Sequence, residues 1–157
     1  MKGLIFGGSS GIGKAVATRI SREGGDVLIC ARNGEKLKSA ADDIRETGLG
    51  KVLWKKIDLG NKASLCPAVD EILHDFGVPD AVLINGGGPP FGSFSKISFE
   101  QWEHSTFEIF LSNILILQKI IPRMKSESSV LFILSDVLRT AGAEKILPCS
   151  LRLALCG

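Results

Sequence analysis

The chain has 157 residues, 45% of them hydrophobic, which suits a domain with an apolar core and excludes a disordered chain. Its 19 Lys and Arg against 17 Asp and Glu leave a formal net charge of +2, so neither nucleic acid nor an anionic membrane is an expected partner. The four cysteines form no C-x-x-C pair, which favours a reduced cytoplasmic protein without a metal site.

Two features of the chain argue against export and membrane insertion. The N-terminus becomes glycine-rich at Gly7, too early for the apolar segment of a signal peptide. The longest mostly apolar stretch, 109–121, contains polar residues and is too short to cross a bilayer. We therefore expect a soluble protein.

The first half of the chain alternates short apolar runs with segments of helical period, a pattern typical of β-α-β units. Asn33 is the expected N-cap of the second helix, because its side chain can accept from the first free backbone N–H groups. The expected elements are strands at 4–6, 27–30 and 52–58, and helices at 11–23, from Asn33 through 44, and at 65–73.

The second half continues the alternation. After a fourth strand at 81–84 comes a glycine- and proline-rich loop, 86–97. Ser98 and Gln101 then form a capping-box pattern that opens a long helix ending near Met124. A fifth strand is expected at 130–134, and the segment from 146 to the end is the beginning of a further helix.

Strands that are apolar on both faces and separated by helices predict a parallel sheet covered on both sides. We therefore expect an α/β fold of Rossmann type, a doubly wound parallel sheet of about five strands with helices on both faces, in a single domain, 1–157.

The C-terminal end of the sequence is abrupt. Leu151, Leu153 and Leu155 belong to an apolar stripe that stops without a cap, and the fifth strand is left as an edge. We therefore expect a fragment or a chain that depends on a partner. A homo-oligomer is also expected, because the long helix carries a broad apolar surface made of Phe107, Phe110, Leu111, Ile114 and Leu117; the alternative is that these side chains belong to the core.

A glycine turn separates the first strand from the first helix. Glycine permits positive φ angles, and backbone N–H groups at the start of a helix can bind a pyrophosphate. The residues predicted to do so are Gly7, Ser9, Ser10, Gly11, Ile12 and Gly13. An ATPase phosphate-binding loop is the alternative, since Gly8 to Lys14 fits G-x-x-x-x-G-K, but the Ser or Thr needed next is Ala15.

The spacing Gly7-x-x-x-Gly11-x-Gly13 resembles the cofactor turn of the short-chain dehydrogenase/reductase family, although Phe6 stands where most members have threonine. The resemblance implies an NAD(P)-dependent oxidoreductase that acts on an alcohol/carbonyl pair of a small-molecule substrate. It extends along the order of elements from residue 1 to about 136.

The end of the second strand bears on the choice of dinucleotide. A site for NAD normally has a carboxylate there to bind the ribose hydroxyls, whereas this chain has Arg32. A guanidinium can bind a 2′-phosphate with charge-assisted hydrogen bonds. The alternative is a solvated arginine at the start of a helix. We expect NADP(H) to be preferred over NAD(H).

Two further segments at the carboxyl ends of strands resemble the family. Asp58 and Leu59 are similar to the acidic and apolar pair that touches the adenine, although Asp58 could equally be a turn residue. Asn85, Gly86 and Gly87 resemble the family's Asn-Asn-Ala-Gly. All these regions meet at one edge of a doubly wound sheet, where ligands bind.

The resemblance also implies a catalytic set of Ser, Tyr, Lys and Asn, of which this chain retains only part. Ser135 occupies the serine position, unless it merely bonds its own turn. The family's spacing places Pro148 at the tyrosine position, Arg152 at the lysine position and Ile109 at the asparagine position. The chain contains no tyrosine, and Asn113 lies one turn after Ile109 on the same helix face.

Three functions remain open at this point. The first is an NADP(H)-dependent oxidoreductase with another proton donor or a bound water. The second is a catalytically impaired or truncated NADP(H)-binding module, motivated by Pro148 and the missing tyrosine. The third is an interaction module that binds no nucleotide and in which the glycine turn is accidental.

Overall fold

The computed structural model describes residues 1–140 and 142–156. Its strands are all parallel and form one sheet in the order β3-β2-β1-β4-β5. They are β1 (Lys2–Phe6), β2 (Asp26–Ala31), β3 (Val52–Lys56), β4 (Ala81–Ile84) and β5 (Ser129–Phe132). The strand order reverses between β1 and β4, and in doubly wound sheets this reversal opens a crevice at the carboxyl ends of the strands. The expected Rossmann-type fold is confirmed.

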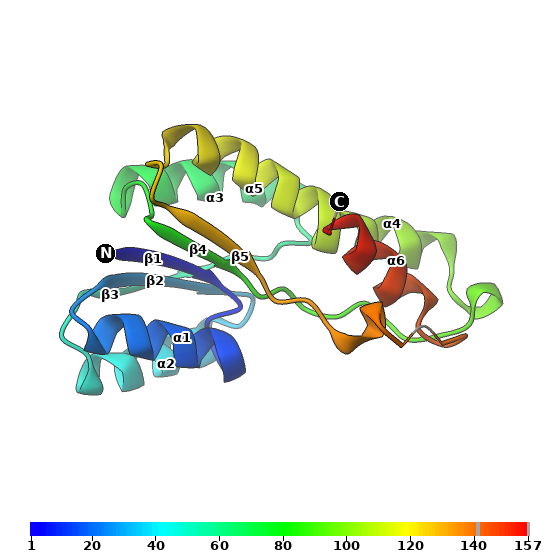
Figure 1. Cartoon of the computed structure of the whole chain (residues 1–157), viewed down its shortest axis with the longest axis horizontal. Helices are drawn as coiled ribbons and strands as arrows, with labels where there is room; N and C mark the ends of the chain where they lie inside the picture. Colours follow the sequence, from blue (N-terminus) through cyan, green and yellow to red (C-terminus); the bar gives the residue numbers. More distant parts are fainter. Residues whose placement is uncertain (141, 157) are drawn as a thin grey trace.

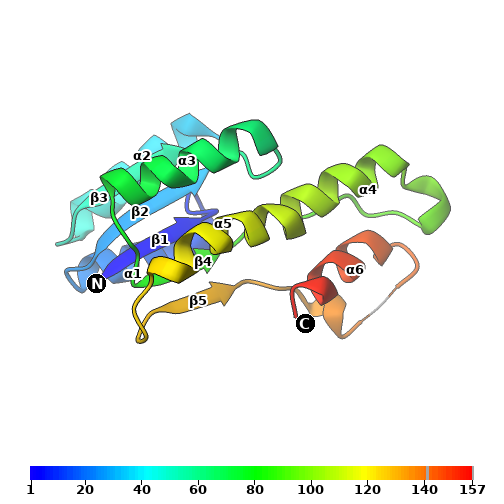
Figure 2. The same cartoon turned by 90° about the horizontal axis from the view of Figure 1, so that it is seen from above.

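The helices cover both faces of this sheet. They are α1 (Gly11–Arg22), α2 (Gly34–Thr47), α3 (Lys62–Asp75), α4 (Phe99–Thr106), α5 (Ser112–Ile120) and α6 (Ile146–Ala154). Figure 1 shows α1 and α2 on one face of the sheet and α3 and α5 on the other. Figures 1 and 2 both show α4 and α6 side by side beyond the carboxyl ends of β4 and β5. These two helices therefore extend the molecule past the sheet.

The predicted helix caps are present. The Asn33 side chain accepts from the backbone N–H of Lys36 at 2.9 Å and so begins α2. At the start of α4, Gln101 N donates to Ser98 Oγ at 3.3 Å and Ser98 N donates to Gln101 Oε1 at 2.9 Å. This capping box satisfies two backbone donors that a helix start leaves without a partner.

The expected long helix contains a π-helical segment, η2 (Phe107–Leu111), between α4 and α5. A 3₁₀ turn, η3 (Ile121–Arg123), then ends it near Met124 as predicted. The π turn inserts an extra residue into the helix and leaves backbone carbonyls in need of other donors. The Ser112 hydroxyl donates to the carbonyl of Glu108 at 2.7 Å, so a side chain replaces one such donor.

Two apolar layers enclose the sheet. Leu4 and Phe6 of β1 face α3 and α5, whereas Ile5 faces α1 and α2, so this central strand is buried on both sides. Each fully buried Leu or Ile contributes about 1.5–3 kcal/mol relative to the exposed side chain. Burial also raises the pKa of the Cys30 thiol far above its ordinary value, which makes Cys30 part of the core.

Two sequence-based expectations about the edge strands are wrong. β3 ends at Lys56 rather than near Asp58, and β5 ends at Phe132 rather than at 134. Neither strand is apolar and buried throughout: Trp54 is 40% exposed and Leu131 is 58% exposed. An edge strand has a neighbour on one side only, so its outer pairing and part of its burial are missing.

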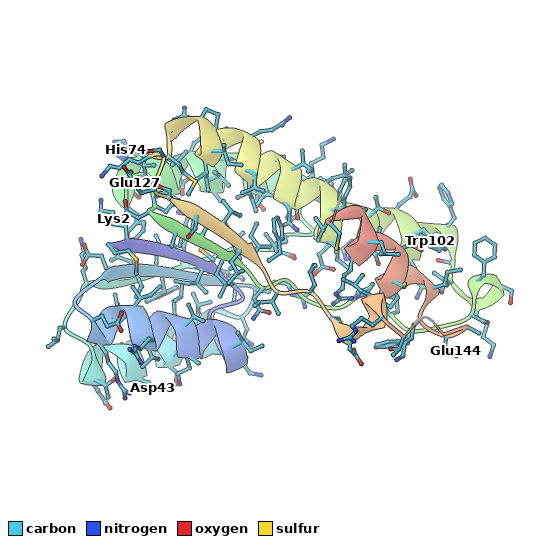
Figure 3. The ribbon with its side chains drawn as sticks, in the orientation of Figure 1. Lys2, Asp43, His74, Trp102, Glu127 and Glu144 are labelled. Atoms are coloured by element: carbon cyan, nitrogen blue, oxygen red, sulfur yellow. The ribbon has the colours of Figure 1, made fainter. Side chains whose placement is uncertain are left out.

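The last helix packs away from the sheet. Leu147 and Leu151 of α6 are buried together with Ile97 and Ile109, and Trp102 of α4 packs against them. Figure 3 labels Trp102 on the α4 side of this cluster and Lys2 at the opposite end of the sheet. The helix expected from 146 ends at Ala154, and Gly157 lies outside the described residues.

Candidate functional site

A cleft of about 520 Å³ lies at the carboxyl ends of β1, β2 and β4, where the strand order reverses. This volume is in the range of small-molecule sites. The predicted cofactor residues that line it are Gly7, Ser9, Ser10, Gly11, Ile12, Arg32, Leu59, Asn85, Gly86 and Gly87. Among the described residues that were predicted, Gly13 and Asp58 lie outside the lining.

The glycine turn has the backbone that its sequence predicts. Gly7 has φ of 74° and Gly11 has φ of 54°, both in the left-handed region that favours glycine. A Cβ at Gly13 would lie 2.2 Å from the carbonyl oxygen of Gly7. Gly13 therefore lets α1 approach the end of β1. It supports the shape of the turn without lining the cleft.

The start of α1 is suited to an anion. Gly7 N and Gly8 N both donate to the Cys30 carbonyl, at 2.8 and 3.1 Å, which ties the turn to β2. Within the described chain the N-cap Ser10 makes no side-chain capping bond, and the first turn of α1 has no acidic residue. The N–H groups of this first turn are thus available to a bound pyrophosphate. The residues present fit a dinucleotide.

The carboxyl ends of β2 and β3 differ in what they offer. Arg32 lines the cleft with a side chain that is 62% exposed. Asp58 Oδ1 accepts from Gly60 N at 3.0 Å, the arrangement of a turn residue, while its neighbour Leu59 lines the cleft. The contacts of Asp58 are therefore those of a turn residue, which was the alternative expectation. Leu59 forms part of the apolar wall of the cleft.

Glu108 is a cleft residue that sequence reasoning missed. It comes from the π-helical segment, its side chain is only 10% exposed, and its Oε1 lies 3.3 Å from Arg32 Nη1. Its Oε2 lies 3.7 Å from His104 Nε2. The available signal was a carboxylate between apolar residues 107 and 109, four residues after a histidine.

The predicted catalytic residues lie beyond the cleft. Ser135 follows β5, and its Oγ donates to Asp136 Oδ1 at 3.0 Å. Arg152 of α6 lines a small second cavity of about 20 Å³ together with Gly86, Gly87 and Asn113. Burial lowers the pKa of the Arg152 guanidinium from its ordinary value. Of the described residues in this set, Arg152 reaches the cleft rim, whereas Ser135 lines neither of these two cavities.

Asn113 adds an unusual feature to the small cavity. Its Nδ2 donates to the Ile109 carbonyl at 2.6 Å, and its side chain is buried. In residues 1–140 and 142–156 no group bonds to Asn113 Oδ1. A buried oxygen without a partner costs about 1–3 kcal/mol. Asn113 therefore carries one satisfied and one unsatisfied polar atom at the wall of the small cavity.

Throughout residues 1–140 and 142–156, no three His, Cys, Asp or Glu side chains gather closely enough to hold a metal ion. Over the same residues, every helix is too short or too polar to cross a membrane.

A family model described as short chain dehydrogenase matches residues 3–146 of this chain. The chain is 29% identical over 134 residues to 11-beta-hydroxysteroid dehydrogenase-like 2 of Arabidopsis thaliana, a match covering 85% of this chain and 44% of that protein. It is 33% identical over 102 residues to a short chain dehydrogenase/reductase of Macrophomina phaseolina, covering 64% of this chain and 58% of the other.

Solved structures share the fold. L-sorbose reductase of Gluconobacter frateurii, complexed with NADPH and L-sorbose, superposes with a TM-score of 0.90 at 21% identity, covering 98% of this chain and 59% of that one. An NADPH-bound short chain oxidoreductase of Pseudomonas aeruginosa with an atypical catalytic center gives a TM-score of 0.87 at 20% identity, with 98% and 61% covered.

The present chain thus spans less than two thirds of each of these relatives. The family match nevertheless runs through all five strands, the glycine turn and the cleft. This chain belongs to the short-chain dehydrogenase/reductase family.

Proposed function

We propose that this chain binds a nicotinamide dinucleotide in the cleft, prefers NADP(H) over NAD(H), and acts as an oxidoreductase on the alcohol/carbonyl pair of a small molecule. The observation that carries the proposal is the uncapped start of α1, which opens on the cleft directly after the glycine turn. The backbone N–H groups of Ser9 to Ile12 would bind the pyrophosphate, supported by the positive end of the helix dipole.

The preference for NADP(H) rests on Arg32. A guanidinium offers several donors in a plane and keeps its charge, so it suits a ribose 2′-phosphate better than the neutral hydroxyl of NAD(H). Leu59, which also lines the cleft, would pack against the adenine.

The chemistry requires a hydride, which the bound nicotinamide supplies, and a proton. The Ser135 hydroxyl would hold the substrate oxygen, and Arg152 would bind ribose hydroxyls and offset the negative charge that develops on that oxygen. Arg152 keeps its own proton, and Pro148 is buried in α6 and has none to give. We infer that the proton comes from water.

A non-catalytic NADP(H)-binding module is the second candidate. Pro148 at the tyrosine position and the absence of tyrosine from the chain favour it. It predicts tight binding of NADPH without turnover, which separates it from the first candidate.

Self-association is a further part of the proposal. Leu111 and Ile114 of the long helix are 46% and 39% exposed, whereas Phe107 and Leu117 of the same helix pack against the core. A homo-oligomer would cover the two exposed side chains. Sedimentation of the chain and of Ile114→Lys tests it, because an unchanged oligomer in that variant rules out this surface.

The test of the main proposal is calorimetric titration with NADPH and NADH, followed by assays of NADPH oxidation against aldehydes, ketones and ketosugars. NADPH binding with turnover supports the oxidoreductase, and NADPH binding without turnover supports the module. Binding of neither dinucleotide refutes both and leaves an interaction module.

A further inference from the structure

Arg32 and Glu108 form an ion pair in the wall of the cleft. Arg32 comes from the end of β2 and Glu108 from η2, and both line the cleft. Their Nη1 and Oε1 atoms are 3.3 Å apart. A Cβ at Gly87 would lie 3.5 Å from Glu108 Oε1 and 3.6 Å from Arg32 Nη2, so the pair lies against the rim that follows β4.

The two partners differ in freedom. Glu108 is held by the helix, its side chain is 10% exposed, and the Ser112 hydroxyl bonds its backbone carbonyl. Arg32 is 62% exposed and has a long flexible side chain. In any rearrangement of this pair, Arg32 moves and the Glu108 carboxylate stays in the wall of the cleft.

We propose that Glu108 is a specificity-determining residue for the cofactor, because its carboxylate competes with the 2′-phosphate of NADP(H) for the Arg32 guanidinium. This inference rests on the proposed binding of a dinucleotide in the cleft. A 2′-phosphate carries about two negative charges, so it loses affinity when its cationic partner is already engaged. The 2′-hydroxyl of NAD(H) is neutral and does not compete. Glu108 therefore makes the ratio of NADPH to NADH affinity smaller than Arg32 alone would give.

His104 is a second basic side chain near Glu108, but it does not replace Arg32 as the partner of the carboxylate. Its Nε2 lies 3.7 Å from Glu108 Oε2, beyond a hydrogen bond, whereas Oε1 faces Arg32. Among the described residues, Arg32 is thus the nearer of the two basic side chains that approach this carboxylate.

The experiment measures dissociation constants for NADPH and NADH at low salt, where an exposed arginine is least screened. Glu108→Gln keeps the size of the side chain and removes its charge. Glu108→Leu does the same with an apolar side chain suited to the buried position, in case the amide fails to fold. Glu103→Gln is the matched control, since Glu103 is an exposed carboxylate of α4 outside the lining of the cleft.

Both Glu108 variants should bind NADPH about 3- to 10-fold more tightly, with NADH changed less than about two-fold. In the Arg32→Ala background the gain from Glu108→Gln should fall below about two-fold, because competition needs the guanidinium.

Three outcomes overturn the inference. One is NADPH binding that weakens or stays equal in both Glu108 variants, and another is an equal gain for both dinucleotides. The third is a gain that persists undiminished in the Arg32→Ala background. If the unaltered chain binds neither dinucleotide, the proposed function fails as well, which is distinct from the first three results.

Discussion

The side-chain nitrogen of Asn113 donates to the backbone carbonyl of Ile109 at 2.6 Å, across the π turn of the long helix. The amide thus supplies a donor that this part of the helix needs, and Asn113 also lines the small cavity shared with Arg152. Asn113 therefore links the irregular helix to the cleft rim.

Asn113→Ala should lower the free energy of unfolding by about 2 kcal/mol, because the loss of the donor to the buried Ile109 carbonyl and the new cavity outweigh the removal of the unpaired Asn113 Oδ1. Urea denaturation monitored by circular dichroism measures the change. Gln118→Ala is the control on the exposed face of α5 and should stay within about 0.5 kcal/mol. Equal effects of the two substitutions would show that the Ile109 bond contributes nothing.

Gly13→Ala should disrupt the glycine turn. The new Cβ would lie 2.2 Å from the Gly7 carbonyl oxygen, so α1 must shift away from β1. We expect a loss of about 1–3 kcal/mol in stability and loss of dinucleotide binding. Gly34→Ala is the matched control, since its nearest neighbour would be Lys56 Cδ at 3.9 Å, and it should change stability by less than about 1 kcal/mol. Normal NADPH binding by the Gly13 variant would contradict the close approach.

Arg32→Ala should weaken NADPH by about 10- to 100-fold and NADH by less than about 3-fold, because only the former loses a charge-assisted contact. Calorimetry with both dinucleotides measures it. Arg22→Ala removes an exposed arginine of α1 outside the cleft lining and should change neither constant. Equal losses of both dinucleotides in the Arg32 variant would refute the phosphate role.

Ser98→Ala should raise the pKa of Glu100 toward its ordinary value. The Ser98 side chain holds that pKa down, aided by a backbone hydrogen bond of Glu100 itself. A lowered folded-state pKa stabilises the fold above the ordinary Glu pKa, and this contribution is lost as the pH falls through the folded-state value. NMR titration of the Glu100 carboxyl measures the shift in both proteins, and an unchanged pKa would show that the hydroxyl is not its cause.

The same variant loses half of its capping box, which should cost about 1 kcal/mol at neutral pH. Ser126→Ala, in the exposed turn before β5, is a control for the loss of a serine hydroxyl and should be close to neutral. Urea denaturation of both variants separates the two cases.

The sequence predicted the features that depend on local chemistry. Asn33, Ser98 and Gln101 cap helices because short polar side chains reach backbone N–H groups within one turn, wherever the helix lies. The glycine turn was predictable for the same reason, since its φ angles are a local property of Gly7 and Gly11.

Features set by distant neighbours escaped prediction. The sequence pattern predicts Leu131 as a core residue, but its side chain is exposed because β5 lies at the edge of the sheet. The sequence pattern predicts Glu108 as a surface residue of a helix. In the structure it lies in the wall of the cleft, where the π-helical segment places it opposite Arg32. The place of β5 depends on which strands pair, and Arg32 is far from Glu108 in the sequence, so the local sequence pattern predicts neither the exposure of Leu131 nor the ion pair of Glu108.

Because α6 packs apart from the sheet, its local stability against unfolding should be lower than that of the sheet. The cluster of α6 holds four buried apolar side chains, whereas the two layers around the sheet hold many more. Amide protons of α6 should therefore exchange with deuterium well before those of β1 and β2. The glycine turn is anchored to β2, so local unfolding of α6, which carries Arg152, would leave the shape of the turn unchanged.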